Sequence, residues 1–71
     1  MALIMYSMTD CPVCLRAKRE LRRRGVSFEA REVDEDELWQ DEVLRLTDQN
    51  TVPVFVHDGG RVEVGFEGEK G

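Results

Sequence analysis

A cysteine pair, Cys11 and Cys14, stands where an apolar run gives way to a segment with helical periodicity. The run over 2–6 has no alternation, which is typical of a strand buried on both faces. Pro12 suits the first turn of a helix, because the N–H group that it lacks would have no partner there. We therefore predict a buried strand over 2–6, a polar loop, and a helix over 12–24. The helix face predicted to be buried consists of Cys14, Ala17 and Leu21.

A second strand and a second helix are predicted next. Gly25 is a natural stop for the first helix, and apolar and polar residues alternate over 26–33. Carboxylates at 34–37 suit the positive end of a helix dipole, so a helix is predicted over 38–47. The residues of the strand expected to face inward are Val26, Phe28, Ala30 and Val33. Those of the helix are Trp39, Val43 and Leu46.

A hairpin is predicted toward the end of the chain. A strand over 51–56 contains Pro53, and the Asp-Gly-Gly at 58–60 is typical of a tight turn into a return strand over 61–64. Residues 65–71 are expected to form a very short helix or a frayed end.

These elements predict an α/β protein with the order β-α-β-α-β-β, in a single domain over 1–71. Strands joined by a helix are expected to be parallel, and the hairpin adds an antiparallel edge. The result is a four-stranded mixed sheet with flanking helices and a short or absent last helix. A C-x-x-C pair at the end of the first strand of such a pattern is typical of a thioredoxin-like fold with a redox site.

Charge and hydropathy argue against two classes of partner. The net charge is −5, whereas binding to a phosphate backbone needs a basic face. No run approaches the ~20 apolar residues of a membrane span, and the first residues lack the pattern of a signal peptide. We expect a cytoplasmic monomer that binds neither nucleic acid nor membrane. In that compartment a cysteine pair is catalytic or metal-binding more often than structural.

A metal site is the alternative explanation of the two cysteines. A structural zinc site needs four ligands, usually from two such pairs. Only His57 could add a nitrogen ligand, which would bring the total to three ligands. We therefore predict no metal, and we expect His57 to face solvent.

The position of Cys11 favours thiol–disulfide chemistry instead. At the start of a helix, free N–H groups and the helix dipole stabilise a negatively charged sulfur. Cys14, one turn further on, is expected to be more buried. Cys11 would then attack a substrate disulfide to form a mixed disulfide, and Cys14 would release the reduced product. Pro12 and Val13 are expected to tune this centre.

Three stretches resemble the glutaredoxin family and together involve nearly the whole chain. They are Y-S-M-T-D-C-P-V-C (6–14), T-V-P-V-F (51–55) and D-G-G-R-V-E-V-G-F-E-G (58–68). The resemblance implies a dithiol protein-disulfide reductase, an electron carrier in cell redox homeostasis with no permanently bound cofactor. Its partners would be proteins that contain a disulfide.

The resemblance also implies roles for particular residues. Cys11 is the expected nucleophile and Cys14 the resolving thiol, with Tyr6 supporting the centre. The Val52–Pro53 bond is expected to be cis and to face the cysteine pair, and the Val52 main chain to pair with substrate as an added strand. The implied substrate- or glutathione-binding residues are Thr51, Val52, Pro53, Gly65, Phe66 and Glu67.

Departures from the family pattern leave the electron donor open. Met8 stands where glutathione-using members usually carry a lysine, and Glu67 follows Gly65-Phe66 where they carry aspartates. The Gly-Phe pair is similar to the NrdH-redoxins, which take electrons from thioredoxin reductase. The C-P-x-C centre is that of glutaredoxins. The expected donor is therefore glutathione or thioredoxin reductase.

Two other functions remain as alternatives. One is a thioredoxin-fold binding module whose cysteines are not catalytic, and the other is deglutathionylation by Cys11 alone. Fast alkylation of Cys11 near ~pH 6 would favour an enzyme over a module. Activity of Cys14→Ser on glutathione mixed disulfides would favour the monothiol reaction.

The first predicted helix carries a basic run. Its cations are Arg16, Lys18, Arg19, Arg22, Arg23 and Arg24. Such a run is typical of a solvated face near the negative end of a helix dipole. The alternative is a docking surface that attracts acidic reductase or substrate proteins.

Overall fold

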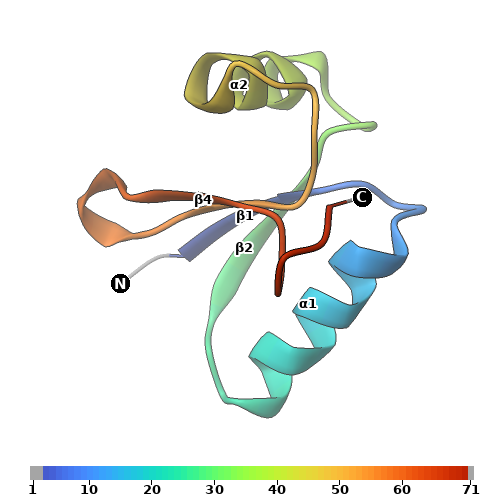
Figure 1. The fold of residues 1–71 in the computed structure, drawn as a ribbon, viewed down its shortest axis with the longest axis vertical. Coiled ribbons are helices and arrows are strands. Elements are labelled where there is room, and N and C mark those ends of the chain that lie inside the picture. Colours follow the sequence, from blue (N-terminus) through green and yellow to red (C-terminus); the bar gives the residue numbers. More distant parts are fainter. Residues whose placement is uncertain (1–2, 71) are drawn as a thin grey trace.

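Two helices pack on opposite faces of a four-stranded sheet (Figure 1). The structure is a computed structural model that describes residues 3–70. Its elements are β1 (Leu3–Ser7), α1 (Pro12–Arg23), β2 (Phe28–Glu32), α2 (Glu37–Thr47), β3 (Val54–Val56), the 3-10 turn η1 (Asp58–Gly60) and β4 (Val62–Val64). The strand order is β2-β1-β3-β4, with β1 and β2 parallel and the other neighbours antiparallel. The predicted element order and the mixed sheet are confirmed.

Alternation along β1 assigns one helix to each face of the sheet. The Tyr6 hydroxyl donates a hydrogen bond to Glu42 of α2, at 2.7 Å. The Ser7 hydroxyl donates to Glu32, whose carboxylate pairs with Lys18 of α1 at 3.1 Å. Successive side chains of a strand point to opposite faces, so α2 covers one face and α1 the other.

Small and branched apolar side chains fill both layers of the core. On the α1 side the buried residues include Met5, Cys14, Ala17 and Phe55. On the α2 side they include Tyr6, Val43 and Val54. Burying a valine- or methionine-sized side chain contributes about 1.5–3 kcal/mol, so these few residues supply much of the driving force for folding.

The end of α1 corrects one expectation about the strand that follows. Gly25 has a φ of +74°, and its N–H donates to the Arg22 carbonyl at 3.0 Å. The Val26 N–H donates to the Leu21 carbonyl at 2.9 Å, which completes a Schellman cap. Val26 therefore belongs to the helix cap and is exposed, and the prediction that it faces inward is wrong.

The position of β2 at the edge of the sheet corrects a second expectation. Val33 is buried and Phe28 half-buried, as predicted, but Ala30 is exposed. Helix α1 meets β2 through long side chains: Lys18 reaches Glu32, and the Arg22 guanidinium lies 5.6 Å from the centre of the Phe28 ring. The small Ala30 side chain is left uncovered on this edge.

Helix α2 begins and ends at aspartates. The Asp36 carboxylate accepts a hydrogen bond from the Leu38 N–H at 2.9 Å, and Asp48 ends the helix with a φ of +58°. Val43 is buried and Trp39 half-buried, as predicted. Leu46 is 42% exposed instead of inward, because it borders a cavity of about 250 Å³ between this end of α2 and the sheet.

The segment before β3 and the segment after β4 differ from the predicted elements. Residues 51–53 are not part of the strand, which begins at Val54. After β4, Phe66 and Glu69 exchange N–H to carbonyl bonds of 2.8 and 2.9 Å across a two-residue turn. Glu67 and Gly68 have positive φ values, as a type I′ turn requires. The short helix or frayed end expected here is a turn, and Gly71 lies outside the described residues.

Among residues 3–70, no helix is long and apolar enough to cross a membrane.

Candidate active site

Cys11 caps the N-terminus of α1 with its own sulfur. It has extended φ and ψ values of −123° and 108°, and its Sγ accepts a hydrogen bond from the Cys14 N–H at 3.2 Å. Its carbonyl accepts from the Leu15 N–H at 3.0 Å, as in the first turn of a helix. A sulfur in this position faces the unpaired N–H groups and the positive end of the helix dipole, which favour negative charge.

Cys14 lies one turn further along α1, fully buried beneath the site. Burial is the largest cause that raises the pKa of Cys14 to about 12, and the hydrogen bond and charge of Cys11 add to it. The Met8 backbone and the Lys18 ammonium lower this pKa by less. Both cysteines are free thiols. Cys11 is also buried, at 4% exposure, but its sulfur lies at the helix terminus beside the groove. The sulfur of Cys14 is held protonated in the core.

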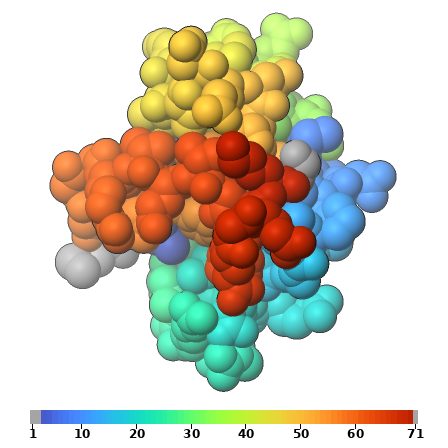
Figure 2. Space-filling view, in the orientation of Figure 1, coloured from blue at the N-terminus to red at the C-terminus, as the bar shows by residue number. Residues whose placement is uncertain are grey.

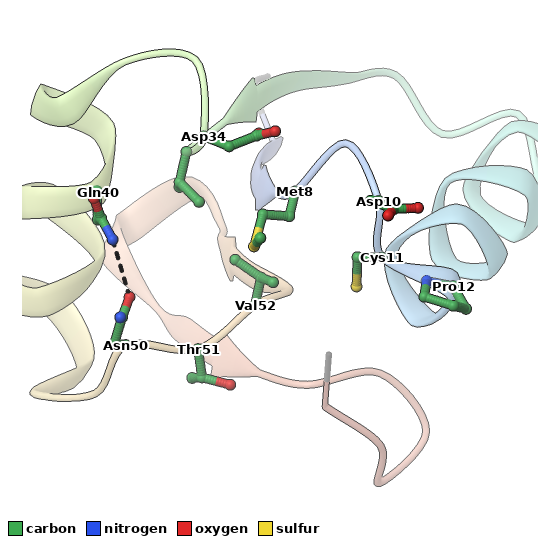
Figure 3. A pocket seen from close by; sticks show the side chains of 10 residues that line it. Met8, Asp10, Cys11, Pro12, Asp34, Gln40, Asn50, Thr51 and Val52 are labelled. Carbon is green, nitrogen blue, oxygen red and sulfur yellow. Dashed lines mark hydrogen bonds between the residues drawn. The ribbon is translucent and has the colours of Figure 1, made fainter.

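A groove of about 440 Å³ opens beside Cys11 (Figure 3). It lies where β1 and β2 end, between the start of α1 and the loop that leads into β3, and α2 closes its far end. Ligands commonly bind beyond the carboxyl ends of parallel strands. Seven of its ten lining residues are Met8, Cys11, Pro12, Val33, Asn50, Thr51 and Val52.

The loop before β3 forms one wall of the groove. Thr51 and Val52 line it directly, and the Val52–Pro53 peptide bond is cis, as predicted. The Pro53 carbonyl accepts a hydrogen bond from the Gly65 N–H at 2.8 Å. Within residues 3–70, no backbone hydrogen bond to the main chain of Val52 is formed. An edge of free peptide groups therefore stands beside the redox thiol.

Comparison with known proteins identifies the family to which this fold and site belong. The sequence model of the family described as glutaredoxin matches residues 3–62. The chain belongs to the glutaredoxin family. Glutaredoxin 3 of Escherichia coli (strain K12) is 35% identical over 60 residues, which cover 79% of this chain and 72% of that protein.

Solved structures of glutaredoxins and of a related redoxin share the fold. The glutaredoxin-like protein NrdH-redoxin from Escherichia coli superposes with a TM-score of 0.79 at 30% identity, over 94% of this chain and 86% of that one. A buckwheat glutaredoxin–glutathione complex gives a TM-score of 0.74 at 30% identity, over 89% of this chain and 59% of that one. The predicted thioredoxin-like fold is confirmed, and this glutaredoxin is a thiol–disulfide oxidoreductase with a C-x-x-C pair.

Other residues predicted for the site lie outside the groove of this glutaredoxin. Tyr6 faces α2, where its hydroxyl donates to Glu42 and accepts from Arg31 at 3.0 Å. Burial and the Glu42 hydrogen bond raise the pKa of Tyr6. Val13 is buried in the core beside the cysteines. Tyr6 and Val13 are thus placed to hold β1 and α1 in position rather than to touch a bound substrate.

The residues after β4 lie on the α1 side of the sheet. The Phe66 ring centre is 6.4 Å from that of Phe55, and Arg16 of α1 forms an ion pair with Glu69. Gly65, Phe66 and Glu67 border two shallow hollows on this side, and the groove beside Cys11 does not include them. Their predicted part in glutathione binding stays a prediction.

Three lining residues were not singled out from the sequence. They are Asp10, Asp34 and Gln40. The Gln40 side-chain amide donates to Asn50 Oδ1 at 3.4 Å, which ties α2 to the loop before β3 (Figure 3). A usable signal was present for Asp34, because it follows the second parallel strand, whose end adjoins the end of β1.

Within residues 3–70, no group of three or more His, Cys, Asp and Glu side chains is arranged to hold a metal ion. His57 lies at the other end of β3, half-buried, where it contacts Glu63. It is therefore remote from the chemistry of the cysteine pair, and its predicted solvent-facing position is only partly matched.

Proposed function

We propose that this glutaredoxin reduces protein disulfides, with Cys11 as the nucleophile and Cys14 as the resolving thiol. The observation that carries the proposal is the inequality of the two sulfurs. Cys11 lines the groove at the positive end of α1, and Cys14 is fully buried with its pKa raised to about 12. Only the sulfur at the groove is placed to meet a substrate disulfide.

The first step exchanges one disulfide for another. The Cys11 thiolate attacks one sulfur of the substrate, the substrate S–S bond breaks, and the second sulfur leaves and takes up a proton. A mixed disulfide then joins Cys11 to the substrate. The number of disulfide bonds is unchanged at this stage: one substrate sulfur is reduced, Cys11 is oxidised, and Cys14 is still a thiol.

The second step needs Cys14 to lose its proton. Two causes of its raised pKa, the hydrogen bond with Cys11 and the charge of Cys11, end once Cys11 is bound in a neutral mixed disulfide. The pKa of Cys14 then falls, and the Lys18 ammonium favours the thiolate. Cys14 attacks the Cys11 sulfur, the mixed disulfide breaks, and the second substrate thiol departs. In total two electrons and two protons pass to the substrate, and a Cys11–Cys14 disulfide remains.

The free peptide groups beside Cys11 offer a way to hold the substrate. An extended segment can add to an unpaired backbone edge as a further strand. The main chain of Val52 is such an edge, and Thr51 and Val52 line the groove next to the Cys11 sulfur. Main-chain pairing at Val52 would orient the substrate disulfide toward Cys11 without selecting a particular side chain.

Single-cysteine variants test the division of labour. The pre-reduced wild-type protein is expected to reduce a protein disulfide such as that of insulin, with one Cys11–Cys14 disulfide formed for each substrate disulfide lost. Cys11→Ser is expected to reduce none. Cys14→Ser is expected to stall after the first step, whereas full turnover by this variant on glutathione mixed disulfides alone would support the monothiol alternative. Full protein-disulfide reduction by Cys11→Ser would refute the proposal.

The electron donor is distinguished by a coupled NADPH assay of the oxidised protein. We propose a cytoplasmic setting, in which the donor is glutathione or a thioredoxin reductase. A relative in the fold comparison was solved with glutathione bound, and NrdH-redoxin is described as having a thioredoxin-like activity profile. Turnover with thioredoxin reductase alone would group this chain with NrdH-redoxin. Turnover with glutathione and its reductase alone would group it with the relative that was solved with glutathione.

A further inference from the structure

The groove beside Cys11 carries two carboxylates and no cation. Asp10 and Asp34 are the acidic side chains among its ten lining residues, and none of the ten is lysine, arginine or histidine. In Figure 3, Asp10 lies beside Cys11, and Asp34 lies on the wall opposite Asn50 and Thr51. No ion pair formed within residues 3–70 includes either aspartate.

Asp34 is held in its charged form by the loop that follows β1. The Thr9 N–H donates to Asp34 Oδ1 at 3.3 Å. Hydrogen bonds from Thr9 are the main cause that lowers the pKa of Asp34, and the Lys18 ammonium adds a smaller effect. The carboxylate is therefore negative at neutral pH.

Nearby cations of α1 are already paired. The Lys18 side chain is 12% exposed and bonds both oxygens of Glu32, at 3.1 and 3.2 Å. Arg16 pairs with Glu69 on the other side of the helix start. The charged side chains that line the groove itself are thus Asp10 and Asp34.

We propose that this groove selects disulfides in which a lysine or arginine stands two residues from the attacked cysteine. The proposal rests on the proposed function, because it needs Cys11 as the attacking thiol. A segment paired with the main chain of Val52 advances about 3.3 Å per residue, and its alternate side chains point to the same face. The side chain two residues from its cysteine therefore points into the groove together with the cysteine. A cation there attracts Asp10 and Asp34, whereas a carboxylate is repelled.

The same repulsion acts against glutathione, which brings two carboxylates and one ammonium group to the site. The chemical step is unchanged: the substrate S–S bond breaks as the bond to Cys11 forms, and the leaving sulfur takes up a proton. The charge of the flanking residue alters how often the encounter succeeds, and so it acts on the second-order rate constant.

Three peptide disulfides that differ at one position provide the test. The residue two positions from the reacting cysteine is Lys, Gln or Glu, and the pre-reduced protein is mixed with each peptide under single-turnover conditions. Each rate constant is divided by that of the same peptide with dithiothreitol, which has no charge and corrects for intrinsic reactivity. We expect the Lys peptide to react about three- to tenfold faster than the Glu peptide at ~20 mM salt, as for surface charge pairs. The ratio should approach one at ~0.5 M salt.

A charge-removing variant identifies the groups responsible. In Asp10→Asn/Asp34→Asn the side chains keep their size, and residue 34 keeps an oxygen for the Thr9 N–H. The Lys-to-Glu rate ratio is expected to fall close to one. The matched control is Asp58→Asn in η1, which removes a carboxylate from a different pocket, lined by Leu3 and Leu21. This control is expected to keep the wild-type ratio.

The outcomes separate this inference from the function on which it rests. Equal normalised rates for the three peptides, a preference for Glu, or an undiminished ratio in Asp10→Asn/Asp34→Asn would overturn the charge selectivity and leave the disulfide reductase in place. Failure of the wild-type protein to reduce any of the three peptides would overturn the proposed function, and the selectivity with it.

Discussion

At the scale of single residues, the site depends on giving two identical thiols different surroundings. The backbone N–H of Cys14 binds the sulfur of Cys11, and the core buries the sulfur of Cys14. The spacing of the two cysteines and Pro12 between them predicted that Cys11 lies at the start of a helix, where free N–H groups face its sulfur. The extent to which Cys14 is buried depends on side chains from β1 and β3, which local sequence does not place.

The inequality of the two thiols predicts a selective alkylation pattern in the reduced protein. Cys11 is expected to react with iodoacetamide faster than Cys14, because its sulfur lines the groove at the helix N-terminus. Cys14, with its pKa raised to about 12, keeps its proton at neutral pH, and its reactivity should appear only as pH rises toward that value. Mass spectrometry of proteolytic fragments resolves the two sites.

Protein unfolded in urea provides the control for this pattern, because both thiols are then exposed and should react at similar rates. Equal alkylation rates for Cys11 and Cys14 in the folded protein would contradict the assignment of roles and would favour a binding module with ordinary thiols.

Other residues of the groove show where reasoning from sequence reaches its limit. Asp34 and Gln40 line the same groove as Cys11 only because the ends of β1 and β2 are level and α2 lies beside them. Tyr6 and Ser7 must face opposite sides of β1, but alternation alone does not say which of them faces α1. Contacts that depend on the sheet order therefore had to come from the structure.

At the scale of elements, hydrophobic period and helix-stop signals predicted the order and type of each segment. Errors arose where an element lies at the border of the fold. Val26 lies in the cap of α1, Ala30 lies on the edge strand, and Leu46 borders a cavity. At Ala30 and Leu46 the element was predicted correctly, but the layer expected to cover the residue does not extend that far. At Val26 the predicted strand began too early, because β2 starts only at Phe28.

The cap of α1 gives a stability prediction at this scale. Gly25 has a φ of +74° with no atom near the site of an added Cβ, so Gly25→Ala introduces backbone strain without a clash. We expect the free energy of unfolding to fall by about 1–2 kcal/mol, as for other residues forced into the left-handed region. Urea unfolding followed by circular dichroism measures the change.

Ser27→Ala is the matched control for this substitution. Ser27 is exposed, lies two residues further on and has no positive φ, so its replacement should change the free energy of unfolding by less than about 0.5 kcal/mol. If Gly25→Ala were as stable as the wild type, the Schellman cap would not be needed to end α1.

At the scale of the whole molecule, charge is distributed differently from what the basic run suggested. Four of its six cations pair with carboxylates of the chain: Arg16 with Glu69, Lys18 with Glu32, and Arg23 and Arg24 with Glu20. These pairs support the prediction of a solvated face over that of a docking surface. Asp10 and Asp34 of the groove beside Cys11 instead form no ion pair within residues 3–70, so part of the negative charge of the chain lies where we propose that the substrate binds.

The location of the trapped mixed disulfide is the most direct test of the proposed roles of Cys11 and Cys14. Cys14→Ser is incubated with a protein disulfide, and the adduct is mapped by mass spectrometry with and without dithiothreitol. The proposed roles of the two thiols predict a substrate cysteine that is bonded to Cys11 and released by dithiothreitol. They predict no adduct in the companion variant Cys11→Ser. An adduct on Cys14 of Cys11→Ser, or none on Cys11 of Cys14→Ser, would contradict the proposed roles of the two thiols.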